Sequence, residues 1–441
     1  MIPCDGTRRT LRESSVVVDG QRIVGVGEKG DLMQKFGRPD RSIDARGKYI
    51  LPGFVNTHTH LFQTLTRGVS IDAPLDIWWL NAVGRVAPFI TADDCFQAAQ
   101  LASVEAVHSG TTCLNDFMYL ATKDDQPKRV VESLLSAGVR GVLSRGITDA
   151  PSPRAPETVQ ELGRAIEDFR SLFQRYDGAG EGRMHVWVAP GSSWAATFKC
   201  FEESILAARE IGARVTFHCS ETESVVKQAE KAWGAKDVVA LGRKGLLGPD
   251  LLAVHCVWLD EEDISMMAAA GVKVSHCPVT NMLLADGAAP MRKMLDARIT
   301  CSLGSDGPAS NFTMDMISVM KTASLLQKVH LLDSTAMSAW DVLEMATRGG
   351  ARVLGLESEI GSVSTGMKAD LVIVDLDRPG NVPVSDPVAS IVYSASPENI
   401  ETVIIDGKVV LDGRRMTTVD ERGAMKAVSG IAERLSRQIG E

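Results

Sequence analysis

The sequence predicts an α/β fold, a (β/α)8 TIM-type barrel with a small β-sandwich domain formed from both chain ends. From residue 50 onward, eight apolar strand candidates alternate with helical stretches, which is typical of a parallel barrel. Segments of β character stand before and after this alternating region. We therefore expect residues 50–356 to form the barrel, and residues 1–49 plus 357–441 to form a small β domain with a C-terminal helix.

The predicted barrel strands are short apolar runs bounded by turn residues. They cover residues 50–58, 111–116, 139–145, 184–190, 213–218, 251–255, 272–276 and 299–304. The helix candidates cover residues 92–108, 127–137, 156–175, 199–211, 221–243, 260–270, 288–297 and 313–328. Thr91 is a plausible N-cap, and Gly138, Gly212 and Gly271 follow predicted helix ends.

The predicted β domain is assembled from short segments at both ends of the chain. They are two strands within 14–27, a strand at 42–50, a helical stretch at 335–355, β segments at 359–377 and 402–413, and an amphipathic helix at 420–440. Asp19-Gly20 and Asp406-Gly407 are hairpin signals, because both residue types tolerate the backbone of tight turns. The segments before and after the barrel are expected to pair in one domain.

Composition excludes several classes of protein. The 441 residues carry a net charge of −9 with no basic stripe, which argues against a nucleic-acid binder. No apolar run reaches the roughly 18 residues that a membrane span needs, and the N-terminal residues do not read as a signal peptide. The 8 cysteines form no C-x-x-C pair, which favours reduced thiols in a cytoplasmic enzyme over a disulfide framework.

The chemistry is expected to centre on a histidine pair, His58 and His60, at the end of the first barrel strand. Alternate residues of a strand point to the same face, so the two imidazoles converge. Two imidazoles so placed suit a metal such as zinc. Taken alone, the pair could equally be two exposed polar residues at a strand end, so the other strand ends decide.

Those other strand ends carry further candidate ligands. Strands five, six and seven end at His218, His255 and His276, and strand eight is followed by Asp306. Such a set at the C-terminal ends of barrel strands is hard to obtain by chance, and that edge is where barrel active sites lie. Strand alternation sends the cysteine after each histidine to the opposite side. His108, His185 and His330 are better explained by structural roles.

Glu221 is the candidate proton carrier. It follows His218 by three residues, so it can be aimed over a metal held at the strand ends. The alternative is an acid stabilised by the dipole at the next helix N-terminus. Glu223 fits that alternative better, so we interpret Glu221 as catalytic.

Several motifs together resemble the amidohydrolase superfamily. They are PGFVNTHTH at 52–60, HCSET at 218–222, HC at 255–256, SHCPVTN at 275–281, LGSDGPASN at 303–311 and IGSVSTGMKADLVIVD at 360–375. The resemblance covers nearly the whole chain. It is strongest to the heteroaromatic aminohydrolase branch, which includes S-adenosylhomocysteine and 5′-methylthioadenosine deaminases, guanine and cytosine deaminases, and triazine hydrolases.

The resemblance implies specific roles for these residues. His58, His60, His218 and Asp306 would bind the metal, Glu221, His255 and Asp306 would handle protons and the attacking hydroxide, and His276 would face the substrate. Relatives with two metals carry a modified lysine at the end of strand four, where this chain has none. One divalent metal per chain is therefore expected, with zinc favoured and iron as the alternative.

Other residues are expected to contact the substrate. The long loop 61–91 holds Gln63, Trp78 and Trp79, whose indoles could stack on a flat ring or simply pack the loop. Arg145, at the predicted end of strand three, could hold a polar substituent. Ser192 and Asn281 lie in two loops where the sequence departs from the adenosine-type deaminases. The first loop lacks their usual histidine and the second lacks their usual lysine.

The implied activity is hydrolytic deamination of an aromatic N-heterocycle of purine, adenosine-derivative, pterin or pyrimidine type, releasing ammonia through a metal-bound hydroxide. One alternative is a triazine-type chlorohydrolase or alkylaminohydrolase. Another is a non-catalytic structural relative that keeps only the fold. We expect a cytoplasmic homo-oligomer that binds a small-molecule heteroaromatic substrate and neither nucleic acid nor membrane.

Overall fold

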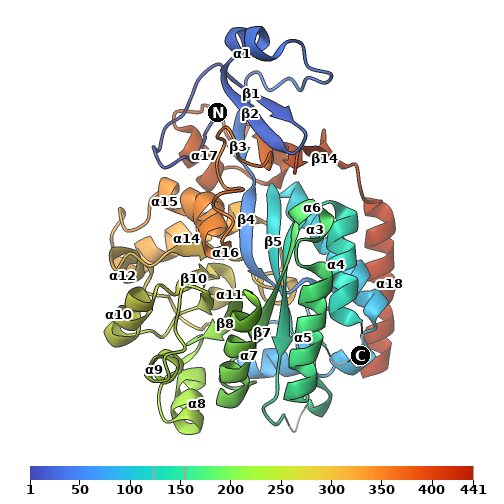
Figure 1. Ribbon diagram of the computed structural model, residues 1–441, viewed down its shortest axis with the longest axis vertical. Helices are drawn as coiled ribbons and strands as arrows, with labels where there is room; N and C mark the ends of the chain where they lie inside the picture. The colour runs from blue at the N-terminus through green and yellow to red at the C-terminus, as the bar shows by residue number, and fades with distance from the viewer. Residues whose placement is uncertain (122, 124, 153–154, 441) are drawn as a thin grey trace.

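An eight-stranded parallel sheet forms the centre of the protein in the computed structural model, which describes residues 1–121, 123, 125–152 and 155–440 (Figure 1). Its strands follow the chain in order from β4 to β11. They are β4 (Phe54–Thr59), β5 (Thr111–Met118), β6 (Arg140–Ile147), β7 (Met184–Pro190), β8 (Val215–Cys219), β9 (Leu251–His255), β10 (Lys273–His276) and β11 (Cys301–Leu303). The first and last strands meet where the Asp306 amide donates to the His58 carbonyl oxygen at 3.0 Å. The predicted barrel is confirmed.

Helices surround the barrel and bury their apolar faces against it (Figure 1). The longer ones are α3 (Ala92–His108), α4 (Gln126–Ala137), α5 (Leu162–Tyr176), α7 (Phe198–Ile211), α8 (Glu223–Trp233), α10 (Glu261–Ala270) and α14 (Met316–Leu331). The shorter ones are α2 (Leu75–Trp79), α6 (Ala179–Gly182), α9 (Asp237–Arg243), α11 (Pro278–Leu283), α12 (Met291–Asp296), α13 (Pro308–Asn311), α15 (Ala339–Glu344) and α16 (Gly350–Leu354). Thr91 caps α3 in a capping box with Asp94, as the sequence indicates.

A second, antiparallel sheet joins the two ends of the chain. Its strand order is β15-β14-β13-β12-β3. The strands are β3 (Tyr49–Pro52), β12 (Leu371–Val374), β13 (Ile400–Ile405), β14 (Lys408–Asp412) and β15 (Arg415–Met416). A separate two-stranded sheet pairs β1 (Ser14–Asp19) with β2 (Arg22–Glu28), and α1 (Lys29–Phe36) and α17 (Pro387–Tyr393) lie at the same end of the molecule (Figure 1). Both predicted hairpins form, whereas the domain boundaries at residues 49 and 357 stay a prediction.

The segment predicted as one strand over 50–58 is two strands that belong to different sheets. β3 pairs with β12, while β4 pairs with β5. The chain passes between the sheets at Gly53, whose amide donates to the Asp370 carbonyl oxygen at 2.9 Å. A Cβ at Gly53 would lie 2.1 Å from Thr112 Oγ1, so only glycine allows this close crossing. β4 therefore begins beside the second sheet, and the histidine pair lies at its opposite end.

The helix predicted over 221–243 is also divided. α8 ends at Gly234, which adopts φ 77°, and α9 begins at Asp237. Glycine in this left-handed conformation is a common helix end. The break lets α9 start beside the loop that follows β8, because the Asp237 carboxylate accepts a hydrogen bond from the Ser220 amide at 2.8 Å.

A buried ion network fixes the second sheet to the barrel. The Arg140 guanidinium, on β6, bonds Asp370 at 2.8 Å and Asp406 at 3.2 Å, and all three side chains are almost fully buried. Removing one partner of a buried ion pair is strongly destabilising, because the remaining charge is then buried without a partner. The network therefore specifies how the sheet formed by both chain ends sits on the barrel.

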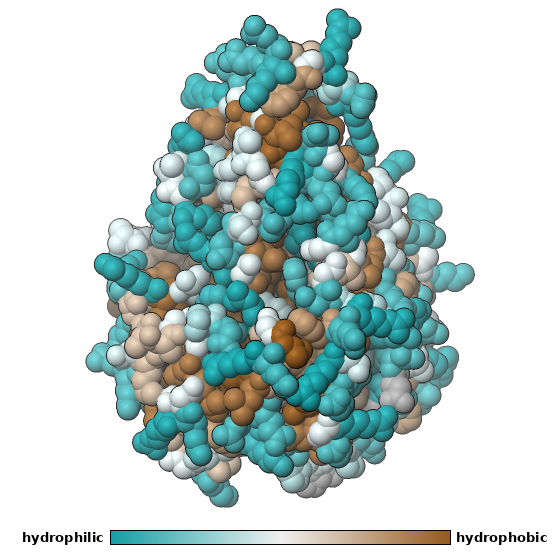
Figure 2. Space-filling view, viewed as in Figure 1, coloured by the Kyte–Doolittle hydropathy of each residue, from teal (hydrophilic) through white to brown (hydrophobic). Residues whose placement is uncertain are grey.

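The C-terminal helix α18 (Glu421–Ile439) runs along α3, as the red helix in Figure 1 shows. Arg434 binds both Asp94 and the Phe89 carbonyl oxygen. Hydrophilic residues cover most of the face shown in Figure 2, and hydrophobic residues appear in separate patches. No helix among the described residues is long and apolar enough to cross a membrane. All eight cysteines are buried free thiols.

Candidate metal centre and active site

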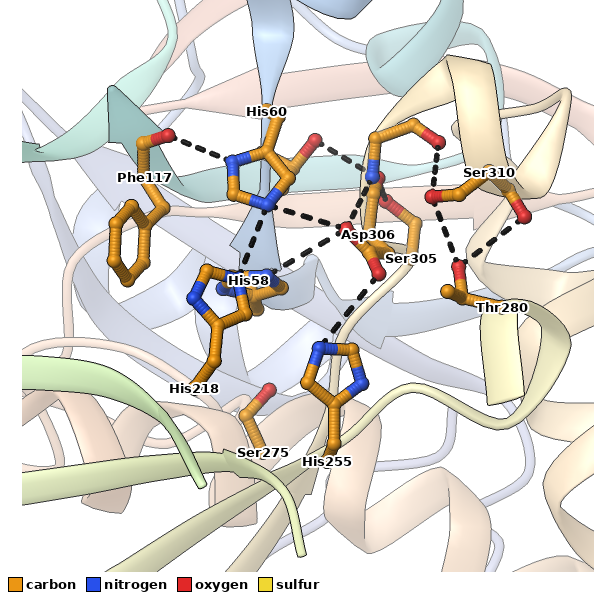
Figure 3. A network of polar contacts seen from close by, with 12 residues as sticks. His58, His60, Phe117, His218, His255, Ser275, Thr280, Ser305, Asp306 and Ser310 are labelled. Atoms are coloured by element: carbon orange, nitrogen blue, oxygen red, sulfur yellow. Dashed lines mark hydrogen bonds and ion pairs between the residues drawn. The ribbon is translucent and has the colours of Figure 1, made fainter. Parts of the chain in front are cut away.

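Four predicted ligands converge at the C-terminal ends of the barrel strands. His58 lies on β4 and His60 directly follows that strand, His218 lies on β8, and Asp306 lies in the loop after β11. Asp306 Oδ1 lies 3.6 Å from His58 Nε2 and 3.4 Å from His60 Nε2. His218 Nε2 lies 3.3 Å from His60 Nε2 (Figure 3). The residues that the sequence places on three separate strands therefore meet at one point.

The donor chemistry of this cluster fits a cation. His60 Nδ1 lies 2.7 Å from the Phe117 carbonyl oxygen, which can only accept, so this nitrogen carries the proton and Nε2 carries a lone pair. His218 Nδ1 lies 3.4 Å from the Gly191 carbonyl oxygen and has the same preference. Two imidazole lone pairs facing each other at 3.3 Å repel unless a cation lies between them. His58 adds two buried ring nitrogens that have no hydrogen-bond partner among the described residues.

The protonation of these residues also suits metal binding. Burial, and then the neighbouring His58 and His60, hold the pKa of His218 well below its usual value. Burial alone would raise the pKa of Asp306, but the neighbouring His58, and then His60 and His255, hold it well below its usual range. Neutral imidazoles and an ionised carboxylate are the forms that bind metals.

A second layer of residues faces this cluster. Glu221 Oε1 lies 3.5 Å from His255 Nε2, which lies 3.9 Å from Asp306 Oδ2. His255 Nδ1 lies 2.9 Å from Asn281 Oδ1, so Asn281 orients the ring and leaves Nε2 directed at the two carboxyl groups. Burial, and then the charge of Asp306, raises the pKa of Glu221 to about 8. Glu221 is therefore a buried carboxyl group that can hold a proton near neutral pH.

The backbone at this edge is unusual. Ser220, His255, Cys256 and Asp306 adopt positive φ values of 44°, 69°, 54° and 63°. Residues other than glycine pay roughly 1–3 kcal/mol for such conformations, which persist only where the surroundings hold them. They lie at the ends of β8 and β9 and after β11, where they redirect the chain as it leaves the barrel. Strained backbone thus coincides with the candidate site.

The ligand cluster opens into a mainly apolar pocket. Its lining residues include Gln63, Trp78, Trp79 and Ser192, which the sequence singled out as substrate contacts. The other lining residues are His60, Leu75, Phe117, Tyr119, Thr148, Gly191, Trp194, Ala195, His218, Glu221, His255, Thr280, Leu284, Asp306 and Ser310. An aromatic, partly enclosed pocket with a few convergent polar groups is the usual form of a small-molecule site.

Comparison with known proteins places the chain among relatives. The amidohydrolase family profile matches residues 49–410. The chain belongs to the amidohydrolase family. It is 36% identical over 426 residues to the 5′-deoxyadenosine deaminase of Methanobrevibacter smithii, covering 96% of this chain and 94% of that protein. It is 36% identical over 436 residues to the 5-methylthioadenosine/S-adenosylhomocysteine deaminase of Pelotomaculum thermopropionicum, covering 99% and 97%.

A solved structure supports the same relationship. The adenosine deaminase from Xanthomonas campestris with bound zinc superposes with a TM-score of 0.91 at 29% identity, covering 99% of this amidohydrolase and 97% of that chain. The fold is therefore shared over nearly the full length, including both ends that form the second sheet.

Three predicted substrate contacts do not line the pocket of this amidohydrolase. Arg145 binds Asp168 at 2.9 Å and the Gly146 carbonyl oxygen at 2.5 Å, so its guanidinium is held by its own surroundings. His276 is fully buried, and neither ring nitrogen has a hydrogen-bond partner among the described residues. Asn281 acts through the His255 ring instead of through the pocket. Their predicted contact with the substrate stays a prediction.

Sequence reasoning missed three aromatic residues that line the pocket, Phe117, Tyr119 and Trp194. Tyr119 packs edge-on against His60, and its hydroxyl accepts a hydrogen bond from Gln63 Nε2 at 2.8 Å. Trp194 packs against Trp79 with ring centroids 5.1 Å apart, and its indole nitrogen has no partner among the described residues. The departure from the adenosine-type deaminases at 191–194 points to Trp194, whereas no local signal marks Tyr119.

Cys277 offers an alternative ligand in this amidohydrolase. Its thiol lies within 4.8 Å of ligand atoms of His58 and Asp306, and His255 forms a similar group with His58 and His218. Burial, and then the charges of Asp306 and Glu221, hold the pKa of the Cys277 thiol well above its usual value. Since the thiolate is the metal-binding form, Cys277 is disfavoured as a ligand. His255 Nε2 also faces Glu221, which suits proton handling better than ligation.

Proposed function

We propose that this amidohydrolase is a hydrolytic deaminase of an aromatic N-heterocycle of the adenosine-derivative class, releasing ammonia. The observation that carries the proposal is a buried Glu221 carboxyl group beside His255 and Asp306, in a pocket lined by Tyr119 and tryptophans. A proton donor, a proton acceptor and a flat apolar pocket are what displacement of an amino group from an aromatic ring requires.

We assign the metal site to His58, His60, His218 and Asp306 and propose zinc as its occupant. Three imidazoles and one carboxylate are a common donor set for zinc. When bound, the metal acidifies water and so makes hydroxide available near pH 7. The proposed stoichiometry is one metal per chain, since the end of β7 (Val188-Ala189-Pro190) offers no lysine to bridge a second ion.

The proposed steps are proton transfers by residues of the chain. Glu221 donates its proton to the ring nitrogen beside the amino-bearing carbon, which makes that carbon electrophilic. Asp306, kept ionised by its histidine neighbours, accepts the proton of the attacking oxygen. His255, fixed by Asn281, orients that oxygen from the opposite side. Asp306 then passes this proton to the amino group, ammonia leaves, and Glu221 regains a proton from the water that enters the site.

The pocket supports a planar substrate. Trp78, Trp79 and Trp194 supply aromatic surfaces, and Gln63 and Ser192 each carry a buried oxygen without a hydrogen-bond partner among the described residues. A buried acceptor left unpaired costs about 1–3 kcal/mol, so a substrate that donates to Gln63 Oε1 gains that energy on binding. The predicted homo-oligomer and cytoplasmic location remain predictions.

The function is tested by an ammonia-release assay over a panel of substrates. The panel contains 5′-deoxyadenosine, 5′-methylthioadenosine, S-adenosylhomocysteine, guanine, cytosine, a pterin and a chlorotriazine. We expect ammonia from at least one adenosine derivative, at a higher kcat/KM than from guanine or cytosine. Chloride release from the triazine without ammonia from any panel member would favour the chlorohydrolase instead.

Metal analysis of the purified protein is expected to give about one divalent ion per chain, because one set of four ligands is present. Inductively coupled plasma mass spectrometry on the active preparation measures it. A reproducible value of two ions per active chain would contradict the mononuclear assignment.

A further inference from the structure

The residue before Glu221 is held in a strained conformation. Ser220 has a φ of 44°, in the left-handed region that residues other than glycine rarely adopt. It is fully buried and lies between His218-Cys219 at the end of β8 and Glu221 in the pocket. Because a change in the backbone angles of one residue swings the next side chain, the conformation of Ser220 sets where the Glu221 carboxyl group points.

Every polar group of Ser220 forms a hydrogen bond, either with the Asp237 carboxylate or with the Trp258 amide. Its amide donates to Asp237 Oδ2 at 2.8 Å, and its hydroxyl donates to Asp237 Oδ1 at 2.6 Å. Its carbonyl oxygen accepts from the Trp258 amide at 2.9 Å. Asp237 is 1% exposed and also accepts from the Val238 amide at 2.9 Å. The carboxylate thus accepts hydrogen bonds from three fixed donors, as a rigid clamp requires.

Asp237 has no role in the chemistry described above. It begins α9, which exists as a separate helix because α8 stops at Gly234. It does not line the pocket, and its carboxylate accepts hydrogen bonds from Ser220 and Val238. A buried carboxylate that binds a single strained residue next to the proton carrier calls for a functional explanation.

We propose that Asp237 is a positioning residue for catalysis: it clamps Ser220 in the left-handed conformation and thereby holds Glu221 against His255. This inference rests on the proposed deaminase function for its kinetic consequence, but the clamp itself is a geometric claim. Misplacement of a reacting group by about 1 Å can cost on the order of 10²-fold in rate. Loss of the clamp therefore lowers kcat, while substrate binding in the aromatic pocket is little changed.

The kinetic test compares Asp237→Ala with Asp237→Asn and Asp94→Ala in the metal-loaded enzyme, using 5′-deoxyadenosine. Asp237→Ala is expected to lower kcat by about 10–10²-fold with KM within about threefold. Asp237→Asn is expected to lose less rate than Asp237→Ala, because its amide oxygen can still accept from the Ser220 amide while its NH2 group then faces the Val238 amide. Asp94→Ala removes a buried helix-capping carboxylate that is not among the residues lining the pocket. It is expected to lower Tm and leave kcat unchanged.

Two double variants separate positioning from a general loss of stability. In the Glu221→Gln background, Asp237→Ala is expected to change kcat by less than about twofold, because both changes disable the same proton transfer. Adding Ser220→Gly to Asp237→Ala is expected to restore part of kcat, since glycine adopts positive φ without strain. Equal kcat losses from Asp237→Ala in both backgrounds would overturn the proposal, as would a wild-type kcat for Asp237→Ala.

A structural readout keeps the clamp testable whatever the substrate proves to be. Crystal structures of the wild-type protein and of Asp237→Ala are expected to differ in Ser220 φ and in the distance between Glu221 and His255. An unchanged Glu221 position would overturn the clamp even if the wild-type enzyme releases ammonia. Conversely, absence of ammonia from every panel substrate would reject the proposed function and leave the crystallographic comparison decisive for the clamp.

If Asp237→Ala does not fold, Ser220→Ala replaces it, with a smaller expected kcat loss of about two- to fivefold from the missing hydroxyl bond.

Discussion

Glu221→Gln is expected to keep the bound metal and lose about 10²–10⁴-fold in kcat, the usual contribution of general acid–base catalysis. Glutamine has nearly the same shape and can still form hydrogen bonds in the pocket, but it cannot carry a proton. The loss should fall on kcat more than on KM, because protonation of the ring develops in the transition state. Steady-state kinetics and metal content are measured on one preparation.

The matched control is Glu223→Gln, two residues further on. Glu223 is the first residue of α8 and pairs with Lys227 at 2.7 Å on the exposed surface. It therefore fills the role of the acid at the helix N-terminus, which is the alternative interpretation of Glu221. Its loss should cost roughly 0.3–1 kcal/mol of stability and little rate. If Glu221→Gln behaves like this control, with full metal and near wild-type kcat, the proton-transfer proposal fails.

His218→Ala is expected to abolish metal retention and activity together. The substitution leaves three ligands and opens a gap at the centre of the cluster, where His218 Nε2 faces His60 Nε2. The ratio of activity to bound metal should stay constant across partially loaded preparations, because each remaining active molecule must hold an ion. Metal content and ammonia release after dialysis against buffer without added metal measure both quantities.

His185→Ala serves as the control for His218→Ala. His185 lies on β7 near Asp177, at 3.5 Å, and outside the pocket. It should keep both metal and rate. Full metal content in His218→Ala would remove this residue from the ligand set and reopen the assignment in favour of His255, which also faces His58.

Much of the barrel could be predicted because its signals are local. The helix expected over 92–108 is α3, bounded by a capping box and by the turn before β5. The two divided elements needed information from elsewhere in the chain. The apolar run 50–58 looks continuous in the sequence, and only pairing of its first half with β12 assigns that half to another sheet. Gly234 was a visible break, but an isolated glycine is also tolerated within helices.

The site was predictable where strand ends alone determine position. Histidines at the ends of several parallel strands must share one edge of the barrel, so His58, His60, His218 and His255 could be placed together. Arg145 shows the limit of that rule. β6 continues to Ile147, two residues beyond the predicted end, and Arg145 lies on the side of the strand that contacts Asp168 of α5. Successive side chains of a strand point to opposite faces, so an error of one residue in a strand's predicted position assigns a side chain to the wrong face.

The contact between the Asp306 amide and the His58 carbonyl oxygen joins strands made at very different times during synthesis. About 250 residues separate the two, so at roughly 5–20 residues per second a ribosome needs about 10–50 s to deliver the second after the first. Throughout that interval β4 has no partner on one side and presents an open edge of hydrogen-bonding groups. The nascent chain must therefore carry His58 and His60 at the end of an unprotected strand until its last barrel strand emerges.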